Sequence, residues 1–330
     1  MKIGHAEFGK HPLFLAPMED VTDPSFRFMC KKFGADLMYT EFISSDGLIR
    51  GGKKGVRKLA ILDEERPVGI QLYGHNTGSM VEAALIAEEA KPDLIDLNFG
   101  CPVKKISNRG AGAGMLRDVP KMIEMTEKIV KAVKLPVTAK TRLGWDHDSI
   151  NVIEVAERLQ DTGIAALTIH ARTRSQLYTG TADWTWIGKV KNNPAMHIPV
   201  IGNGDIDSPE KALEMFNRYG VDAVMVGRAT IGQPWILAEI RHYLDHGERK
   251  TPLSIGQKVE IAKEHLTKSM EWKGDRAGVL TMRRHLALYF KFLPHFREMK
   301  IRLLTAATRN EVEDILDEIV LKYKNNPEEI

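Results

Sequence analysis

One of the two cysteines in this chain, Cys101, lies in the segment Asn98-Phe99-Gly100-Cys101-Pro102, directly after the apolar run 94–97. Gly100 lets the backbone turn sharply and Pro102 cannot donate to a β-ladder, so we expect the thiol at a strand end, facing a cleft. A thiol in that position can react with a substrate. The alternative is a small buried hydrophobe, because free cysteine is among the most buried residue types.

Two glycine-bearing loops indicate a phosphate site. They are Gly202-Asn203-Gly204-Asp205 and Gly227-Arg228, and each follows a short apolar run. Glycine lets backbone N–H groups approach an anion, and the start of a following helix favours negative charge. Arg228 can add a charge-assisted hydrogen bond. Tight turns without a ligand are the alternative.

Lys140 and His170 belong to two further apolar runs. Lysine is rare on a buried strand unless its ammonium reaches a polar cavity. Schiff-base chemistry and the stabilisation of a negatively charged reduced ring both suit this residue type. His170 is either a contact in the same cavity or a hydrogen-bonded core histidine.

Eight short apolar runs must position these side chains, and they cover residues 13–16, 37–41, 68–72, 94–97, 137–141, 166–169, 199–201 and 223–226. Segments with helical periodicity lie between them, including 77–90, 120–133, 150–162 and 209–219. The alternation predicts an α/β fold, a (β/α)₈ TIM barrel, with an open doubly wound sheet as the competing arrangement. We favour the barrel because nearly every run ends in polar or glycine residues, as expected where strand ends share one mouth.

After Trp235 the pattern is helical without strands, over 236–244, 255–272, 276–292 and 311–322. The polar segment 245–252 contains Gly and Pro and is typical of a linker, which predicts a barrel domain at 1–245 and an all-α domain at 246–330. Residues 258–309 contain twelve Lys/Arg against five Asp/Glu. This basic segment suits a polyanion such as nucleic acid, or is simply a solvated surface. Residues 325–330 are expected to fray.

Composition narrows the class of protein. With 330 residues, 43% of them hydrophobic and 28% charged, the chain can bury a large core. No apolar run approaches the roughly 20 residues that span a bilayer, and the N-terminus lacks the apolar centre of a secretion signal. We therefore expect a cytoplasmic protein without a membrane partner. Two cysteines are too few for a disulfide framework or a cysteine-rich zinc site, so no metal is expected.

Taken in order, these motifs closely resemble those of the flavin-dependent tRNA-dihydrouridine synthases, most of all the bacterial B-type branch. The resemblance runs nearly end to end. It is carried by 16–18, Gln71, 98–105, 140–145, 170–174, 203–206, 227–228 and 234–235. The chain departs from the family pattern at Glu19, Ala171 and Gly202, where alanine, glycine and alanine are familiar.

The resemblance implies that the barrel binds FMN and that the helical domain grips tRNA, with NADPH or NADH as the reductant. The implied cofactor contacts are Pro17, Met18, Glu19, Gln71, Lys140, His170, Asn203, Gly204, Asp205, Gly227 and Arg228. The implied catalytic residue is Cys101. Residues that would hold the target uracil are Asn98, Arg142, Arg172 and Tyr178.

The implied reaction is reduction of the C5–C6 bond of a D-loop uridine, at position 17 for the B-type branch. Reduced FMN gives hydride to C6, and Cys101 gives a proton to C5, because a thiol with a pKa near 8.5 is mostly protonated at pH 7. The uridine must be flipped out of the RNA, which costs a few kcal/mol. Candidate tRNA backbone contacts are Lys104, Lys105, Arg174, Arg283, Arg284 and His285. No protein partner is implied, and we expect a monomer.

Two other functions are weighed against this one. A flavin barrel that acts on a free pyrimidine, as dihydroorotate dehydrogenase relatives do, has no use for a basic helical domain. A noncatalytic RNA-binding or regulatory barrel has no need to retain Cys101, Lys140 and His170 together.

Overall fold

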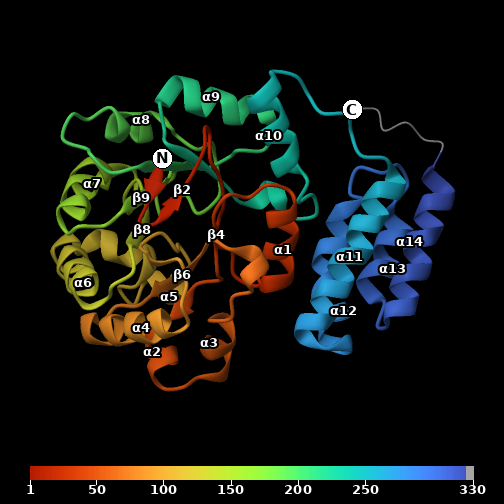
Figure 1. Ribbon diagram of the computed structural model, residues 1–330, viewed down its shortest axis with the longest axis horizontal. Coiled ribbons are helices and arrows are strands. Elements are labelled where there is room, and N and C mark those ends of the chain that lie inside the picture. The colour runs from red at the N-terminus through yellow and green to blue at the C-terminus, as the bar shows by residue number, and fades with distance from the viewer. Residues whose placement is uncertain (325–330) are drawn as a thin grey trace.

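The computed structural model describes residues 1–324, and the expectation for 325–330 lies outside them. Eight parallel strands form the barrel (Figure 1). They are β3 (Leu13–Leu15), β4 (Met38–Tyr39), β6 (Val68–Tyr73), β7 (Leu94–Asn98), β8 (Val137–Arg142), β9 (Ala166–His170), β10 (Val200–Asn203) and β11 (Ala223–Val226). A parallel bridge from Phe14 to Leu37 joins β3 to the residue before β4 and closes the ring. The predicted barrel is thereby confirmed.

The other strands are short. β1 (Lys2–Ile3) and β2 (Ala6–Glu7) form an antiparallel hairpin, and Ile3 packs in one buried cluster with Phe8 and Phe14. β5 (Ile43–Ser44) pairs with the end of β6. The sequence run 37–41 therefore contributes only a two-residue strand, and residues 40–42 connect it to β5.

Helices cover the outside of the barrel. They are α1 (Pro24–Lys32), α2 (Ser45–Ile49), α3 (Lys53–Lys58), α4 (Thr77–Glu89), α5 (Lys104–Ser107), α6 (Val119–Ala132), α7 (Val152–Asp161), α8 (Thr185–Lys191), α9 (Pro209–Tyr219) and α10 (Ile236–His246). Local sequence explains their limits. The side chain of Ser208 accepts a hydrogen bond from the Lys211 amide at the start of α9, and Gly220 ends that helix with a φ of 67°.

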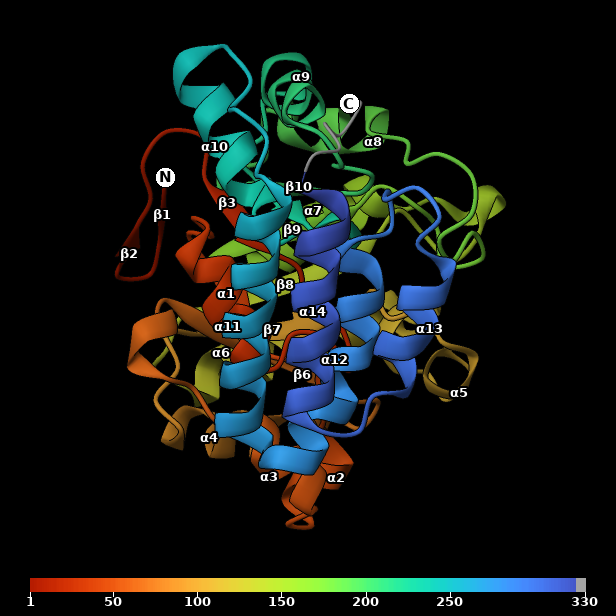
Figure 2. The same ribbon diagram turned by 90° about the vertical axis from the view of Figure 1, so that its right-hand side faces the viewer.

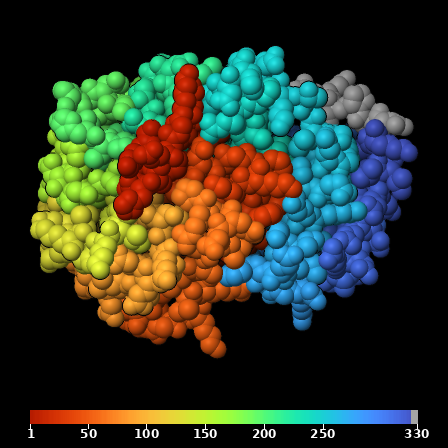
Figure 3. Space-filling view, viewed as in Figure 1, coloured from red at the N-terminus to blue at the C-terminus, as the bar shows by residue number. Residues whose placement is uncertain are grey.

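Four helices follow the barrel: α11 (Ile255–Lys273), α12 (Asp275–Tyr289), α13 (Arg297–Thr305) and α14 (Arg309–Tyr323). They have their own buried cluster, which includes Leu266, Leu286, Leu303 and Leu316. Of these helices, α11 and α12 face the flank of the barrel next to α1, and α13 and α14 pack on their outer side (Figures 1 and 2). The space-filling view shows the helical part of the chain in contact with the barrel along that flank (Figure 3).

Three of these last four helices were predicted, and α13 was not. Only Met299 and Leu303 of its nine residues are buried, so its apolar periodicity is weak. None of the helices within residues 1–324 combines the length and apolar character needed to cross a membrane.

Candidate active site

A cavity of about 620 Å³ opens at the carboxyl ends of the barrel strands. Strand register explains which side chains meet there. Asn98 on β7 is paired with Lys140 on β8, Arg142 on β8 with His170 on β9, and His170 with Asn203 on β10. All five line the cavity, as do Pro17, Met18, Glu19, Cys101, Tyr178, Gly204, Asp205, Gly227 and Arg228. The structure thus brings most of the predicted site residues into one space.

Cys101 is held at the cavity by the side chain of Asn98. The Oδ1 atom of Asn98 accepts hydrogen bonds from the backbone N–H groups of Gly100 at 3.0 Å and Cys101 at 2.9 Å. Cys101 is only 6% exposed, and this burial raises the pKa of its thiol above the usual range. The sulfur is therefore protonated at neutral pH and can act as a proton donor.

The Asn98 amide continues into a buried chain of hydrogen bonds. Its Nδ2 donates to Oε1 of Gln71 at 2.8 Å, and Nε2 of Gln71 donates to Oδ2 of Asp96 at 2.6 Å. The hydroxyl of Thr138 donates to Oδ1 of Asp96 at 2.5 Å. The carboxylate at one end accepts and the backbone N–H groups at the other end donate, so each amide in the chain has one allowed orientation.

Asp96 was missed by the sequence interpretation, although an aspartate inside the apolar run 94–97 is itself a signal. Burial raises the pKa of Asp96 to about 6, and the hydrogen bonds from Gln71 and Thr138 oppose that shift. Gln71, a predicted cofactor contact, is fully buried and does not line the cavity. Its side chain supports the site from within the barrel.

Lys140 extends across the mouth, and its Nζ donates to Oδ1 of Asn203 at 3.0 Å. Burial and the neighbouring Arg142 charge lower the pKa of Lys140 to about 7, while the Asp96 charge opposes that shift. Nδ2 of Asn203 is fixed by the carbonyl of Met225. Burial also lowers the pKa of His170 well below its usual value, so this imidazole is neutral.

Arg142 links the Cys101 loop to the segment that carries Tyr178. Its Nε donates to the carbonyl of Gly100 at 2.7 Å, and its Nη1 donates to the carbonyls of Thr173 and Leu177 at 2.8 Å. The guanidinium lies 5.5 Å from the ring centre of Tyr178. Burial lowers the pKa of Arg142 to about 10, so the group remains a cation at neutral pH.

Arg172, predicted to hold the substrate base, has a different environment. It is 1% exposed and is absent from the cavity lining. Its Nη2 forms an ion pair with Oδ2 of Asp205 at 2.6 Å and donates to the carbonyl of Gly180. Arg228 binds Oδ1 of the same carboxylate at 3.1 Å. Asp205 is thus already shared by two arginines, and the pair Arg172–Asp205 shapes the loop around Tyr178.

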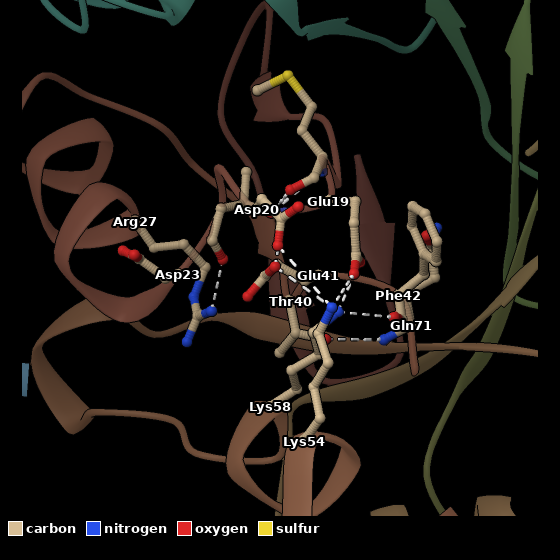
Figure 4. A network of polar contacts seen from close by, with 12 residues as sticks. Glu19, Asp20, Asp23, Arg27, Thr40, Glu41, Phe42, Lys54, Lys58 and Gln71 are labelled. Atoms are coloured by element: carbon tan, nitrogen blue, oxygen red, sulfur yellow. Dashed lines mark hydrogen bonds and ion pairs between the residues drawn. The ribbon is translucent and has the colours of Figure 1, made fainter. Parts of the chain in front are cut away.

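Glu19, where the chain departs from the family pattern, is the centre of an ion-pair network at the rim (Figure 4). Nζ of Lys54 lies 2.9 Å from one carboxylate oxygen, and Nζ of Lys58 lies 2.5 Å from the other. Glu41 lies 3.6 Å from Lys58 and accepts from the backbone N–H of Asp20. Ligand atoms of Glu19, Asp20 and Glu41 lie within 4.8 Å of one another, and the two lysines supply the cations between them.

The predicted tRNA contacts differ in their surroundings. Lys104 and Lys105 are exposed on α5. Arg174 donates to Ser107 and stacks 4.3 Å from the ring centre of Trp145. The prediction for His285 is wrong: this side chain is 1% exposed and stacks on Phe26 at 4.9 Å, so it faces the interface between α12 and α1. The apolar periodicity of the sequence did not show which side of α12 is buried.

Fold and site define the class of protein as a (β/α)₈ barrel whose cavity at the strand ends contains a thiol, a lysine and two glycine loops. The barrel resembles histamine dehydrogenase from Rhizobium sp. 4-9, with a TM-score of 0.56, 16% identity, and coverage of 81% of this chain and 50% of that one. It also resembles 6-hydroxypseudooxynicotine amine oxidase from Pseudomonas geniculata N1, with a TM-score of 0.58, 14% identity, and coverage of 84% and 53%. The chain spans about half the length of those structures.

Sequence comparison gives the family. The family described as "Dihydrouridine synthase (Dus)" matches residues 14–325, and this chain belongs to it. The tRNA-dihydrouridine synthase B of Pseudomonas aeruginosa is 41% identical, over 87% of this chain and 86% of the relative. The probable tRNA-dihydrouridine synthase of Rickettsia bellii is 40% identical over 91% of both chains. The B-type protein of Shewanella oneidensis is 37% identical over 97% and 99%.

Proposed function

We propose that this protein is a flavin-dependent tRNA-dihydrouridine synthase that reduces the C5–C6 bond of a D-loop uridine. The observation that carries the proposal is the thiol of Cys101, whose backbone is fixed by Asn98 at the edge of a cavity lined by Lys140, His170 and the two glycine loops. Position 17 is the target that the resemblance to the B-type branch implies.

The residues that line the cavity suit a phosphorylated flavin. A Cβ added at Gly204, where φ is 132°, would lie 2.9 Å from Cβ of Ala182, so only glycine suits this loop. The short helix 228–230 begins directly after Gly227, and Lys140 and Arg228 bring positive charge. We assign the cofactor to Pro17, Met18, Lys140, His170, Asn203, Gly204, Asp205, Gly227 and Arg228, with Glu19 at the rim and Gln71 as an internal support.

When bound, FMN reduced by NADPH or NADH would supply the hydride for uracil C6. Cys101 then donates its proton to C5, because its raised pKa keeps the thiol protonated until a carbanion-like atom forms beside it. Arg142 lies on the same cavity and can stabilise negative charge on a uracil oxygen. Both polar groups of Asn98 have protein partners, so we assign Asn98 to positioning Cys101. Tyr178 borders the base site, and Arg172 acts through Asp205.

We further propose that residues 1–245 form the catalytic domain and 246–330 the tRNA-binding domain, and that the protein works as a cytoplasmic monomer. The linker between α10 and α11 and the separate core of the four last helices support this division. Lys104, Lys105, Arg174, Arg283 and Arg284 remain candidates for the RNA backbone, and His285 does not.

The test is direct. The purified protein is incubated with FMN, NADPH and tRNA from a bacterial strain lacking dihydrouridine synthases, and dihydrouridine is mapped along the tRNA. We expect product at position 17. A preparation that takes up no FMN, or that reduces free uridine or dihydroorotate-type pyrimidines but leaves tRNA unmodified, would overturn the proposal.

A further inference from the structure

A second cavity, of about 510 Å³, lies where α1 and α3 of the barrel meet α11 and α12. Two short segments of the chain, around residues 19–20 and 41–42, separate it from the first cavity. Glu19 and Phe42 line the first cavity, whereas their chain neighbours Asp20 and Glu41 line the second. A ligand group in the second cavity therefore lies just across this wall from the catalytic mouth.

Most charged groups around the second cavity are neutralised by ion pairs. Lys273 pairs with Asp23, and Arg27 forms a buried pair with Glu65 at 2.7 Å. Lys54 and Lys58 are shared among the carboxylates of Glu19, Asp20 and Glu41. These three carboxylates carry one negative charge more than the two lysines.

Three arginines of the same cavity are held by neutral partners instead. Arg57 on α3 lies 5.7 Å from the ring centre of Trp272. Arg283 donates to the backbone carbonyls of Thr305 and Ala306, at 2.8 and 2.7 Å. Arg284 donates to the backbone carbonyl of Asp20 at 2.9 Å. Within residues 1–324, no carboxylate forms an ion pair with any of the three guanidinium groups.

These partners fix the direction of each guanidinium without cancelling its charge. Two positive charges are thus in excess around a polar cavity formed by both parts of the chain. Arginine presents a planar fork of N–H groups that matches the oxygens of a phosphate. A carbonyl or an aromatic face uses only part of that fork, so donors remain for a ligand.

We propose that this second cavity binds a phosphodiester group of the RNA backbone through Arg57, Arg283 and Arg284. The proposal rests on the tRNA substrate of the proposed function. A nucleotide whose base is flipped into the first cavity leaves its flanking phosphates outside the barrel mouth. The second cavity receives such a phosphate from both sides, with Arg57 on the barrel and the other two arginines on α12. The contact offsets part of the cost of unstacking.

The test compares Arg57→Gln with the wild-type holoenzyme. Arg57 is exposed, so the variant should fold. We expect the Kd for tRNA to rise roughly fivefold at moderate ionic strength, and the slope of log affinity against log salt to fall by about 1. Arg57→Lys, which keeps the charge but loses the fork, should give an intermediate Kd. The value of kcat at saturating tRNA should stay unchanged while KM rises.

Arg218→Gln is the control for loss of a ring-stacked arginine elsewhere on the surface: Arg218 on α9 lies 5.3 Å from the ring centre of Tyr219, and its charge is paired with Glu214 at 3.1 Å. If Arg57→Gln has the same Kd and salt slope as this control, the second cavity does not bind RNA phosphate. If the wild type itself binds no tRNA, the proposed function fails and this inference fails with it. Wild-type binding combined with unaltered Arg57 variants would overturn the inference alone.

Discussion

The side chain of Asn98 holds the backbone of Cys101, with Oδ1 accepting the Cys101 N–H at 2.9 Å. The same oxygen accepts from Gly100, and the amide nitrogen is bound to Gln71. The thiol is therefore placed by a chain of buried amides that begins at Asp96 inside the barrel. The segment that follows also contacts Cys101, since the N–H of Ala113 donates to the Cys101 carbonyl at 3.0 Å.

Asn98→Ala should weaken both the fold and the reaction. It leaves two N–H groups and the Gln71 carbonyl oxygen without partners, so we expect the free energy of unfolding to fall by about 1–3 kcal/mol. Uridine reduction in a single turnover should fall further than FMN affinity. Asn76→Ala is the control, since Asn76 makes the same type of side-chain bond, to the N–H of Ser79, at the exposed start of α4. An Asn98→Ala protein that is less stable but reduces uridine at the normal single-turnover rate would contradict the positioning role.

Cys101→Ala should lose the proton donor and little else. We expect uridine reduction to fall by about 10²- to 10⁴-fold, which is typical for removal of a general acid, while FMN and tRNA affinities stay close to wild type. Cys30→Ala is the control. Cys30 is fully buried in the barrel core, so that variant should lose stability without losing chemistry. Equal rates for the two variants would remove Cys101 from the mechanism.

Lys140 should make FMN affinity depend on pH. Its pKa of about 7 in the protein without cofactor means that the ammonium is charged below pH 7 and largely neutral above it. An anionic ligand favours the charged form, so binding takes up a proton above pH 7, and the Kd should rise by up to tenfold per pH unit from 7 to 9. The phosphate charge is constant over that interval, since its second pKa is near 6. Fluorescence titration measures the Kd.

Lys140→Met should bind FMN more weakly and with no pH dependence between 7 and 9. Lys128→Met serves as the control, because Lys128 is exposed on α6 and pairs with Glu124 one turn earlier. A wild-type Kd that stays flat over the interval would show that Lys140 does not titrate with cofactor binding.

The barrel could be predicted because each strand is a short apolar run and each ends in polar residues. Cys101, Lys140 and His170 follow directly from that pattern, since the carboxyl ends of parallel strands meet at one mouth. The same pattern did not predict that β4 has only two residues, and it did not predict the weakly amphipathic helix α13. Apolar pattern locates an element, but a two-residue strand depends on the neighbours it pairs with.

Partners of the site residues could not be predicted, because they come from distant parts of the chain. Asp205 is 33 residues from Arg172, so the sequence did not indicate that the two side chains form an ion pair. Arg172 was therefore predicted to contact the substrate base instead. Gln71 is 25 residues from Asp96. His285 shows the same limit for a helix, since its burial is decided by Phe26 on α1. Residue types indicated which side chains could take part in the reaction, but their hydrogen-bond and ion-pair partners depend on the three-dimensional packing.

The ion pair between Asp23 and Lys273 should stabilise the junction of the barrel and the helical domain. Asp23 caps α1 by accepting from the Phe26 N–H, and Lys273 lies at the end of α11. Burial opposes ionisation of Asp23, but the Lys273 charge and the hydrogen bonds from Lys273, Ser25 and Phe26 outweigh it and lower the pKa to about 2. A depressed carboxyl pKa stabilises the fold above the unfolded value of 3.8, and this contribution is lost as pH falls toward 2.

Lys273→Met leaves a buried carboxylate without its cation. We expect the free energy of unfolding at pH 7 to fall by about 3–5 kcal/mol, and acid unfolding to begin at a higher pH because the pKa of Asp23 rises. Urea unfolding between pH 3 and 7 measures both effects. The exposed pair Lys128–Glu124 serves as the comparison, since Lys128→Met should lower the free energy of unfolding by no more than about 0.5 kcal/mol. The double variant Asp23→Asn, Lys273→Met should recover part of this loss of stability, because it has no unpaired charge. A further loss of stability in the double variant would show that Asp23 stabilises α1 without help from Lys273.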